Sequence, residues 1–193
     1  MVHAYGLAAS QLQRIRSRNI PLTIAVDSVA ASGGYMMACV ANYIIAAPFA
    51  IIGSIGVIAQ VPNFNKLLKK FDIDYNEFTA GEYKRTVTIM GENSEQDKAK
   101  FTEQIEDTHL LFKEFISQNR PSVDIAKVST GEHWFGTRAL ENKLVDELKT
   151  SDDYLLEKSE HADLFAIKYK KKRNMLEKFS RQTQKLIDQV RFS

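Results

Sequence analysis

The feature that most constrains the fold of this chain is a long segment that is almost free of charge. Residues 19–65 carry one formal charge, Asp27, in 47 positions. Short apolar runs within the segment are separated by residues that favour turns, and they predict strands at 22–26, 43–47 and 55–60. An unpaired charge is costly in a strand that is covered on both faces, so the segment is expected to be buried.

A membrane-spanning helix is a poor explanation for the same segment. Its longest apolar run, residues 43–61, is interrupted by Pro48, Gly53 and Gly56. A spanning helix needs about 20 predominantly apolar residues without such breaks. Buried strands joined by turns therefore remain the better interpretation.

Stretches with helical periodicity alternate with these apolar runs. Helices are predicted at 5–18, 31–41, 63–70, 94–118, 124–128, 137–142, 151–159 and 175–190, with further strands at 75–79 and 164–169. Ser94 followed by Asp97 resembles a capping box. The alternation predicts an α/β fold with a mostly parallel sheet and flanking helices. Because the chain opens on a helix, we expect a strand to be missing upstream.

The remaining charges divide the chain into two parts. Residues 168–193 hold nine Lys or Arg against two acids, whereas residues 1–167 have a net charge of −5. We expect a domain over 1–167 and a basic amphipathic helix or tail over 168–193. That tail could be a solvated helix, lie on an anionic membrane surface or pack on another subunit. Its basic run at 170–173 is too short to indicate nucleic-acid binding.

Composition excludes several classes of protein and site. Hydrophobic residues make up 44% and charged residues 26% of 193 positions, which is typical of a globular domain rather than a disordered or collagen-like chain. The single cysteine, Cys39, excludes a disulfide framework within the chain and a Cys-rich zinc site. We expect no metal and no cofactor. The first residues do not resemble a signal peptide.

One serine occupies a position that suits a nucleophile. Ser32 lies in the sequence Val29-Ala-Ala-Ser-Gly-Gly-Tyr35, between a predicted strand and a predicted helix. Open α/β sheets place their sites at the carboxyl ends of strands, and N–H groups there can stabilise a developing negative charge. The simpler alternative is that Ser32 only caps the helix.

A serine nucleophile needs a base, and Lys84 is the candidate. The four histidines form no recognisable Ser-His-Asp arrangement. Lys84 follows a predicted strand and the turn at Ala80-Gly81. A lysine with its reference pKa must be disfavoured in its charged form by about 4.6 kcal/mol to be neutral at pH 7. Burial in an apolar site can lower a lysine pKa by that much. The alternative is an ordinary exposed lysine. Asp27 is expected to end its strand rather than to act in catalysis.

Four motifs together resemble a known family. They are Val29-Ala-Ala-Ser-Gly-Gly-Tyr35, Gly53-Ser-Ile-Gly-Val57, Thr79-Ala-Gly-Glu-Tyr-Lys84 and Thr130-Gly-Glu-His-Trp-Phe-Gly-Thr-Arg-Ala-Leu140. Their order and spacing closely resemble the signal peptide peptidase A family of Ser-Lys serine proteases, and within it the SohB branch. The resemblance covers roughly residues 1–150. It implies a ClpP/crotonase-like fold whose N-terminal strands are missing here.

The resemblance assigns roles to individual residues. It implies that Ser32 is the catalytic nucleophile, that Lys84 is the general base, that Ser54 orients that lysine, and that the Gly33 N–H is one oxyanion donor. A second oxyanion donor and a membrane anchor are expected upstream of Met1. The chain is therefore expected to be a C-terminal portion with weak or no activity of its own. Ile55, Gly56 and Val57 are expected to pair with an extended substrate as an added strand.

Partners and location follow from the same resemblance. It implies a membrane-associated endopeptidase that cuts peptides such as remnant signal peptides or unfolded segments. The expected location is the bacterial inner membrane, with the catalytic domain facing the periplasm. Homo-oligomers are expected, in which the dyad can be completed across a subunit boundary.

Two other functions remain open. One is a non-catalytic assembly or binding module on the same ClpP/crotonase-like fold. The other is acyl-CoA chemistry, which is disfavoured because the neutral segment offers no acid/base carboxylate apart from Asp27.

Overall fold

The computed structural model describes residues 2–169. Residues 2–157 form one compact unit, and the described residues from Lys158 onward belong to a second. We expected the boundary after residue 167. The predicted basic helix at 175–190 lies outside the described residues.

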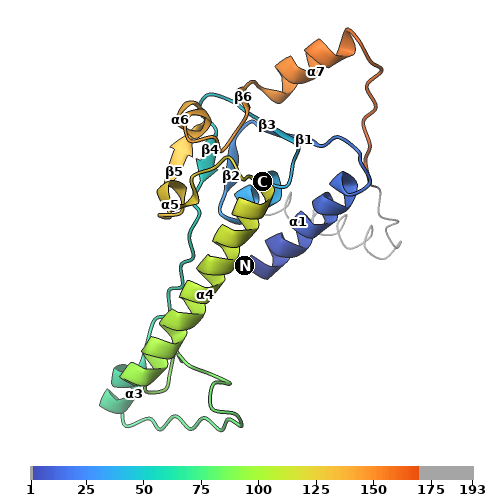
Figure 1. Ribbon diagram of the computed structural model, residues 1–193. Coiled ribbons are helices and arrows are strands. Elements are labelled where there is room, and N and C mark those ends of the chain that lie inside the picture. Colours follow the sequence, from blue (N-terminus) through green and yellow to red (C-terminus); the bar gives the residue numbers. More distant parts are fainter. Residues whose placement is uncertain (1, 170–193) are drawn as a thin grey trace, which may run out of the picture. The chain divides into compact units, whose positions relative to one another are not determined.

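Two small sheets form the centre of the larger unit (Figure 1). In the first, β1 (Thr23–Val26), β3 (Tyr43–Ala46) and β6 (Glu147–Leu148) are all parallel. In the second, β2 (Val29–Ala31) runs parallel to β4 (Ile51–Gly53), and β5 (His133–Phe135) is antiparallel to β4. The predicted α/β fold with a mostly parallel sheet is confirmed.

Seven helices accompany these strands in the described residues. They are α1 (Val2–Arg16), α2 (Gly33–Ala38), α3 (Asn65–Lys70), α4 (Glu95–Asn119), α5 (Ile125–Val128), α6 (Gly136–Glu141) and α7 (Ser151–Ser159). The predicted capping box begins α4. The Asp97 N–H donates to Ser94 Oγ at 3.1 Å, and the Ser94 N–H donates to the Asp97 carboxylate at 2.9 Å.

The neutral segment supplies most of the core, as its lack of charge predicted. Ile44, Ile45, Ile52 and Val40 are completely buried, and Leu144 joins them from the other end of the domain. Of these residues, Val40, Ile44, Ile52 and Leu144 belong to one cluster with buried residues of α1, α2 and the C-terminal part of α4.

A buried ion pair joins α4 to the first sheet. Arg120, the residue after α4, is 7% exposed and binds both carboxylate oxygens of Asp146 at 2.9 Å. The same carboxylate accepts the Ile44 N–H at 2.7 Å, and Arg120 also donates to the Lys143 carbonyl. A charge this deep is tolerated because its partner and these hydrogen bonds replace water.

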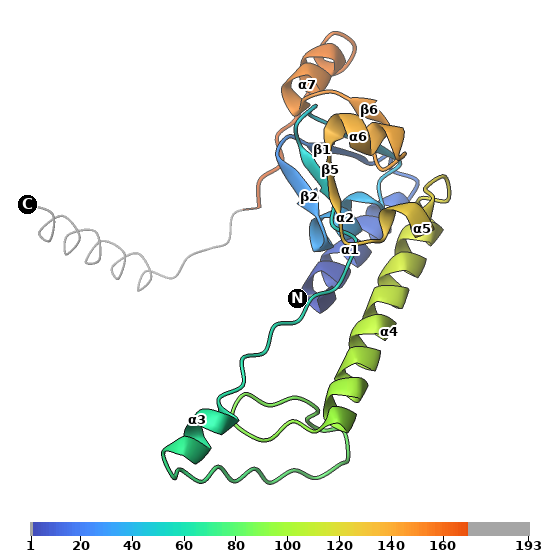
Figure 2. The ribbon, with the colours of Figure 1, turned by 90° about the vertical axis from the view of Figure 1, so that its left-hand side faces the viewer.

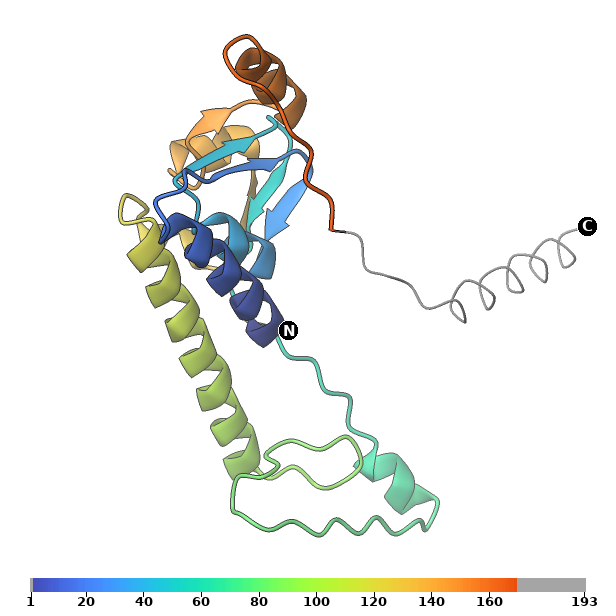
Figure 3. The same cartoon turned by 90° about the vertical axis from the view of Figure 1, so that its right-hand side faces the viewer.

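Residues 57–111 form an extension that we call the arm. No residue of the arm is buried, and the buried residues of α4, Phe112 and Ile116, lie beyond it. The chain leaves β4, runs to α3 and returns along α4 (Figures 2 and 3). The arm is therefore held without a hydrophobic core of its own.

Three predicted strands did not form, and four short ones were missed. Residues 55–60, 75–79 and 164–169 are not in strands, because no neighbouring strand within the described residues supplies ladder hydrogen bonds. The missed strands are β2, β4, β5 and β6, each only two or three residues long. Such lengths carry too little periodicity to be recognised in a sequence.

Across residues 2–169, none of the helices is both long and apolar enough to cross a membrane.

Candidate active site

Ser32 lies where β2 turns into α2, and its backbone is strained. Its φ of 51° and ψ of −119° are unusual for a residue with a side chain, and such strain costs about 1–3 kcal/mol. The Ser32 N–H donates to the Gly53 carbonyl at 2.7 Å, and its own carbonyl accepts the Met36 N–H at 3.0 Å. These two bonds fix the turn at the carboxyl end of β2.

The Ser32 hydroxyl does not cap α2. Ser32 occupies the N-cap position, but its side chain makes no capping hydrogen bond. Helix capping therefore does not explain why a serine stands there. Strained residues of this kind cluster at active sites and ligand clamps.

Gly33 is packed closely against a side chain of α1. A Cβ added to Gly33 would lie 2.2 Å from two ring carbons of Tyr5, which projects from α1. As the first residue of α2, Gly33 has no acceptor for its N–H within the helix. This N–H is the one to which the family resemblance gives the role of oxyanion donor.

Ser32 and Gly33 open onto a cavity of about 210 Å³. The cavity is mostly apolar, and its wall comes from α1, α2, α4 and the segment after β4: Val2, Tyr5, Ser32, Gly33, Met36, Gly56, Val57, Ile58 and Phe112. The structure thus brings together four of the residues singled out by sequence, Ser32, Gly33, Gly56 and Val57. Tyr5, Met36 and Phe112 were missed, because only the packing of three helices brings them to one place.

Ser54 lies beside Ser32 across the second sheet. Ala31 pairs with Gly53, so Ser32 and Ser54 follow the carboxyl ends of neighbouring parallel strands. Ser54 also has a positive φ, 50°, and its N–H donates to the Glu132 carbonyl at 2.7 Å. Ile55 is fully buried, and its carbonyl accepts the Gly131 N–H at 3.2 Å. The segment 55–57 thus begins anchored in the core and ends at the cavity.

Lys84 is not brought to this cavity. It lies in the arm, is exposed and is absent from the cavity wall. Its N–H donates to the Gly81 carbonyl at 3.1 Å in a turn where Gly81 has a φ of +99°. The loops between α3 and α4, drawn in green, lie near the N-terminal end of α4, away from the sheets (Figure 2).

Other titratable groups near the sheets have structural partners. Asp27 follows β1, and its carboxylate accepts the hydroxyl and the N–H of Ser151 at the start of α7. These hydrogen bonds hold the Asp27 pKa below its usual value. Burial raises the pKa of the Cys39 thiol to about 12, so Cys39 is a core residue rather than a nucleophile. Among residues 2–169, no cluster of His, Cys, Asp and Glu could hold a metal ion.

Comparison with known proteins gives a consistent family. Residues 14–165 match Peptidase family S49. The chain is 58% identical over 184 residues to "Probable protease SohB" of Haemophilus influenzae, covering 95% of this chain and 52% of that protein. It is 59% identical over 180 residues to "Probable protease SohB" of Buchnera aphidicola subsp. Acyrthosiphon pisum, covering 93% and 54%. The chain spans about half the length of these curated relatives.

A more distant relative and a solved structure complete the comparison. "Putative protease MJ0651" of Methanocaldococcus jannaschii is 31% identical over 137 residues, with 70% of this chain and 44% of that protein covered. An enoyl-CoA hydratase/isomerase from Marinobacter aquaeolei aligns with a TM-score of 0.45 and 12% identity, over 83% of this chain and 42% of that one. The match over most of the chain and the high identity to the curated proteases lead to one conclusion: the chain belongs to peptidase family S49.

Proposed function

We propose that this chain carries the nucleophile and the general base of a serine endopeptidase, Ser32 and Lys84. The observation that carries the proposal is the strained Ser32, whose hydroxyl is not used as a cap and which opens onto an apolar cavity. The relatives named as proteases support the reaction class.

The reaction would be acyl transfer to Ser32. Neutral Lys84 takes the hydroxyl proton while the Ser32 Oγ attacks the peptide carbonyl, and the Gly33 N–H binds the oxyanion. Protonated Lys84 then gives its proton to the leaving amine, and water hydrolyses the acyl-enzyme through the same base. The segment 55–57 would align the substrate backbone, and an apolar substrate side chain would enter the cavity.

Within a single chain, Lys84 lies in the arm and does not line the cavity at Ser32. A dyad therefore requires a lysine that comes from elsewhere. The arm that carries Lys84 has no buried residue and exposes large apolar side chains such as Phe71 and Phe78, 64% and 94% exposed. We propose that the arm packs on a second copy and that Lys84 of the partner subunit completes the site. Burial at that interface would also favour the neutral amine that a base requires, and Ser54 would orient it.

We propose that the full-length protein is anchored to the bacterial inner membrane, faces the periplasm and cuts signal-peptide remnants or unfolded segments. Losing one oxyanion donor typically costs about 10²–10³ in rate, so we expect the 193-residue chain to be weakly active if the second donor lies upstream of it.

Labelling with a serine-directed fluorophosphonate tests the dyad in the full-length protein. Ser32→Ala and Lys84→Ala should each abolish labelling. Lys84→Arg should abolish it too, because an arginine cannot act as a base. Lys66→Ala, which removes another exposed lysine of the arm, should leave labelling unchanged. Equal labelling of all variants would contradict the dyad and favour a non-catalytic module.

Mixing the two inactive variants tests whether the dyad forms between subunits. The Ser32→Ala variant keeps Lys84, and the Lys84→Ala variant keeps Ser32. If the two residues come from different subunits, random mixing after dissociation should restore about one quarter of the sites. No restoration would place both residues in one chain.

A further inference from the structure

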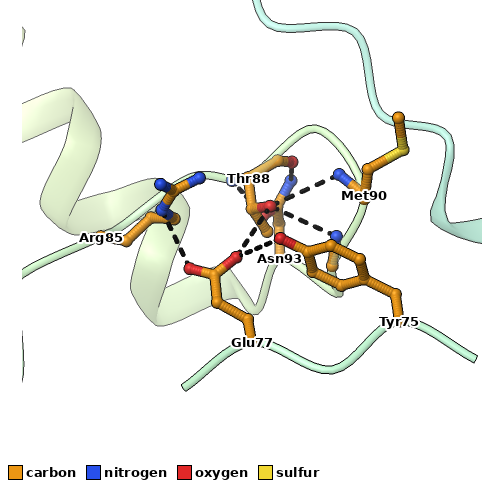
Figure 4. A network of polar contacts seen from close by, with 7 residues as sticks. Tyr75, Glu77, Arg85, Thr88, Met90 and Asn93 are labelled. Carbon is orange, nitrogen blue, oxygen red and sulfur yellow. Dashed lines mark hydrogen bonds and ion pairs between the residues drawn. The ribbon is translucent and has the colours of Figure 1, made fainter. Parts of the chain in front are cut away.

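Figure 4 shows a polar network within the arm, and its residues come from the sequence on both sides of Lys84. Glu77, upstream of Lys84, accepts a hydrogen bond from the Tyr75 hydroxyl at 2.6 Å and forms an ion pair with Arg85 Nε at 2.9 Å. The Thr88 hydroxyl donates to the same carboxylate at 3.4 Å. The Glu77 side chain is 25% exposed, whereas its neighbour Phe78 is 94% exposed. The Glu77 carboxylate thus faces the network, although the residue stays accessible to solvent.

Amide side chains hold the downstream side of this network. The Thr88 N–H donates to Asn93 Oδ1 at 2.9 Å, and Asn93 Nδ2 donates back to the Thr88 carbonyl at 3.0 Å. Asn63 Nδ2 donates to the same carbonyl at 3.0 Å and to the Gly91 carbonyl at 2.9 Å. No residue of the arm is buried, so these hydrogen bonds, rather than apolar packing, hold its loops together.

We infer that Glu77 is a positioning residue for Lys84. Glu77 and Arg85 flank residues 78–84, and their ion pair joins the two ends of this loop. Lys84 is the last residue of the loop, next to Arg85. The inference rests on the proposed function, because it assumes that Lys84 is the base. Closing the loop reduces the conformations that Lys84 samples before it meets Ser32.

The position of Glu77 distinguishes it from other acids of the arm. Glu77 contacts residues on both sides of Lys84, whereas the Lys69–Glu92 pair joins α3 to the stretch before α4 and is exposed on both partners, 61% and 79%. Removing Glu92 should therefore leave the loop that presents Lys84 in place, because an exposed ion pair contributes little.

The test measures fluorophosphonate labelling of the full-length protein over a range of probe concentrations. Glu77→Ala and Glu77→Gln should lower the maximal labelling rate about 10- to 100-fold, because a misplaced base loses orientation. The probe concentration for half-maximal rate should change less than about twofold, because the cavity is intact. Glu92→Gln is the matched control and should stay within about twofold of the wild type in both quantities.

A charge exchange separates positioning from simple structural support. The double variant Glu77→Arg with Arg85→Glu rebuilds the ion pair in reverse and should recover most of the lost rate, whereas each single reversal should not. If Glu77→Ala lowers the fraction of oligomer or the melting temperature in proportion to its loss of labelling rate, the role of Glu77 is structural and the inference fails. It also fails if the exchange recovers nothing.

Lys84→Ala, measured beside these variants, separates failure of the inference from failure of the proposed function. If Lys84→Ala abolishes labelling while Glu77→Ala stays within twofold of the wild type, the dyad stands and only the role of Glu77 is overturned. If Lys84→Ala labels normally, the dyad fails and the inference fails with it.

Discussion

At the scale of single residues, the site depends on backbone positions as much as on reactive groups. Ser32 has a positive φ, and Gly33 lies so close to the Tyr5 ring that an added Cβ would overlap it. The sequence correctly marks Ser32-Gly33-Gly34 as a small-residue turn at a strand end. It does not show that Tyr5 covers Gly33, because that contact joins two helices far apart in the chain.

The two glycines of this turn should respond oppositely to the same substitution. Gly33→Ala should lower the free energy of unfolding by about 1–3 kcal/mol, because its methyl group would overlap the Tyr5 ring. Gly34→Ala is the matched control: its methyl group meets nothing within 4 Å, and alanine favours a helix by about 0.5–1 kcal/mol over glycine. Chemical denaturation measures both. Equal effects would contradict the close Tyr5 contact.

At the scale of elements, α4 connects the arm to the core. Its start is fixed by the Ser94 capping box, which the sequence revealed because both partners are local. Its end is fixed by Arg120 and Asp146, which lie 26 positions apart and carry no local signal. The pair ties the end of the helix to the loop before β6 and to the edge of β3 through the Ile44 N–H.

Breaking this ion pair should destabilise the domain strongly. Asp146→Asn should cost about 3–5 kcal/mol, because it leaves the Arg120 charge buried without its counter-charge. Glu141→Gln is the control: its partner Arg138 is 3.8 Å away and both side chains are exposed, so the cost should stay below about 0.5 kcal/mol. Urea unfolding at neutral pH measures the difference. Similar losses in both variants would show that the buried pair contributes no more than a surface contact.

At the scale of the whole molecule, the arm is the feature that a single chain does not explain. Residues 57–111 contain no buried residue, yet they include many exposed apolar side chains and the candidate base. Exposed apolar surface of this extent marks an interaction site. On the function proposed above, a second copy of the chain covers this surface and brings Lys84 to Ser32.

Substitutions at the arm should therefore change the oligomeric state of the full-length protein. Replacing Phe71 and Phe78 together by serine should shift the protein toward smaller species in analytical ultracentrifugation, because both side chains are exposed in the single chain. Phe165→Ser is the control: this phenylalanine is 84% exposed but lies outside the arm. An unchanged oligomer after the double substitution would contradict the arm as the interface.

The fold class, the core and the position of the candidate nucleophile could be read from the order of the amino acids. This was possible because these depend on local patterns: the lack of charge in residues 19–65, the alternation of apolar runs with helices, and the small residues around Ser32. The position of Lys84, the side chains that wall the cavity and the ion pair of Glu77 beside Lys84 became visible only in the folded chain. Those features depend on contacts between distant segments, and an extended run such as 75–79 becomes a strand only when another strand is there to pair with it.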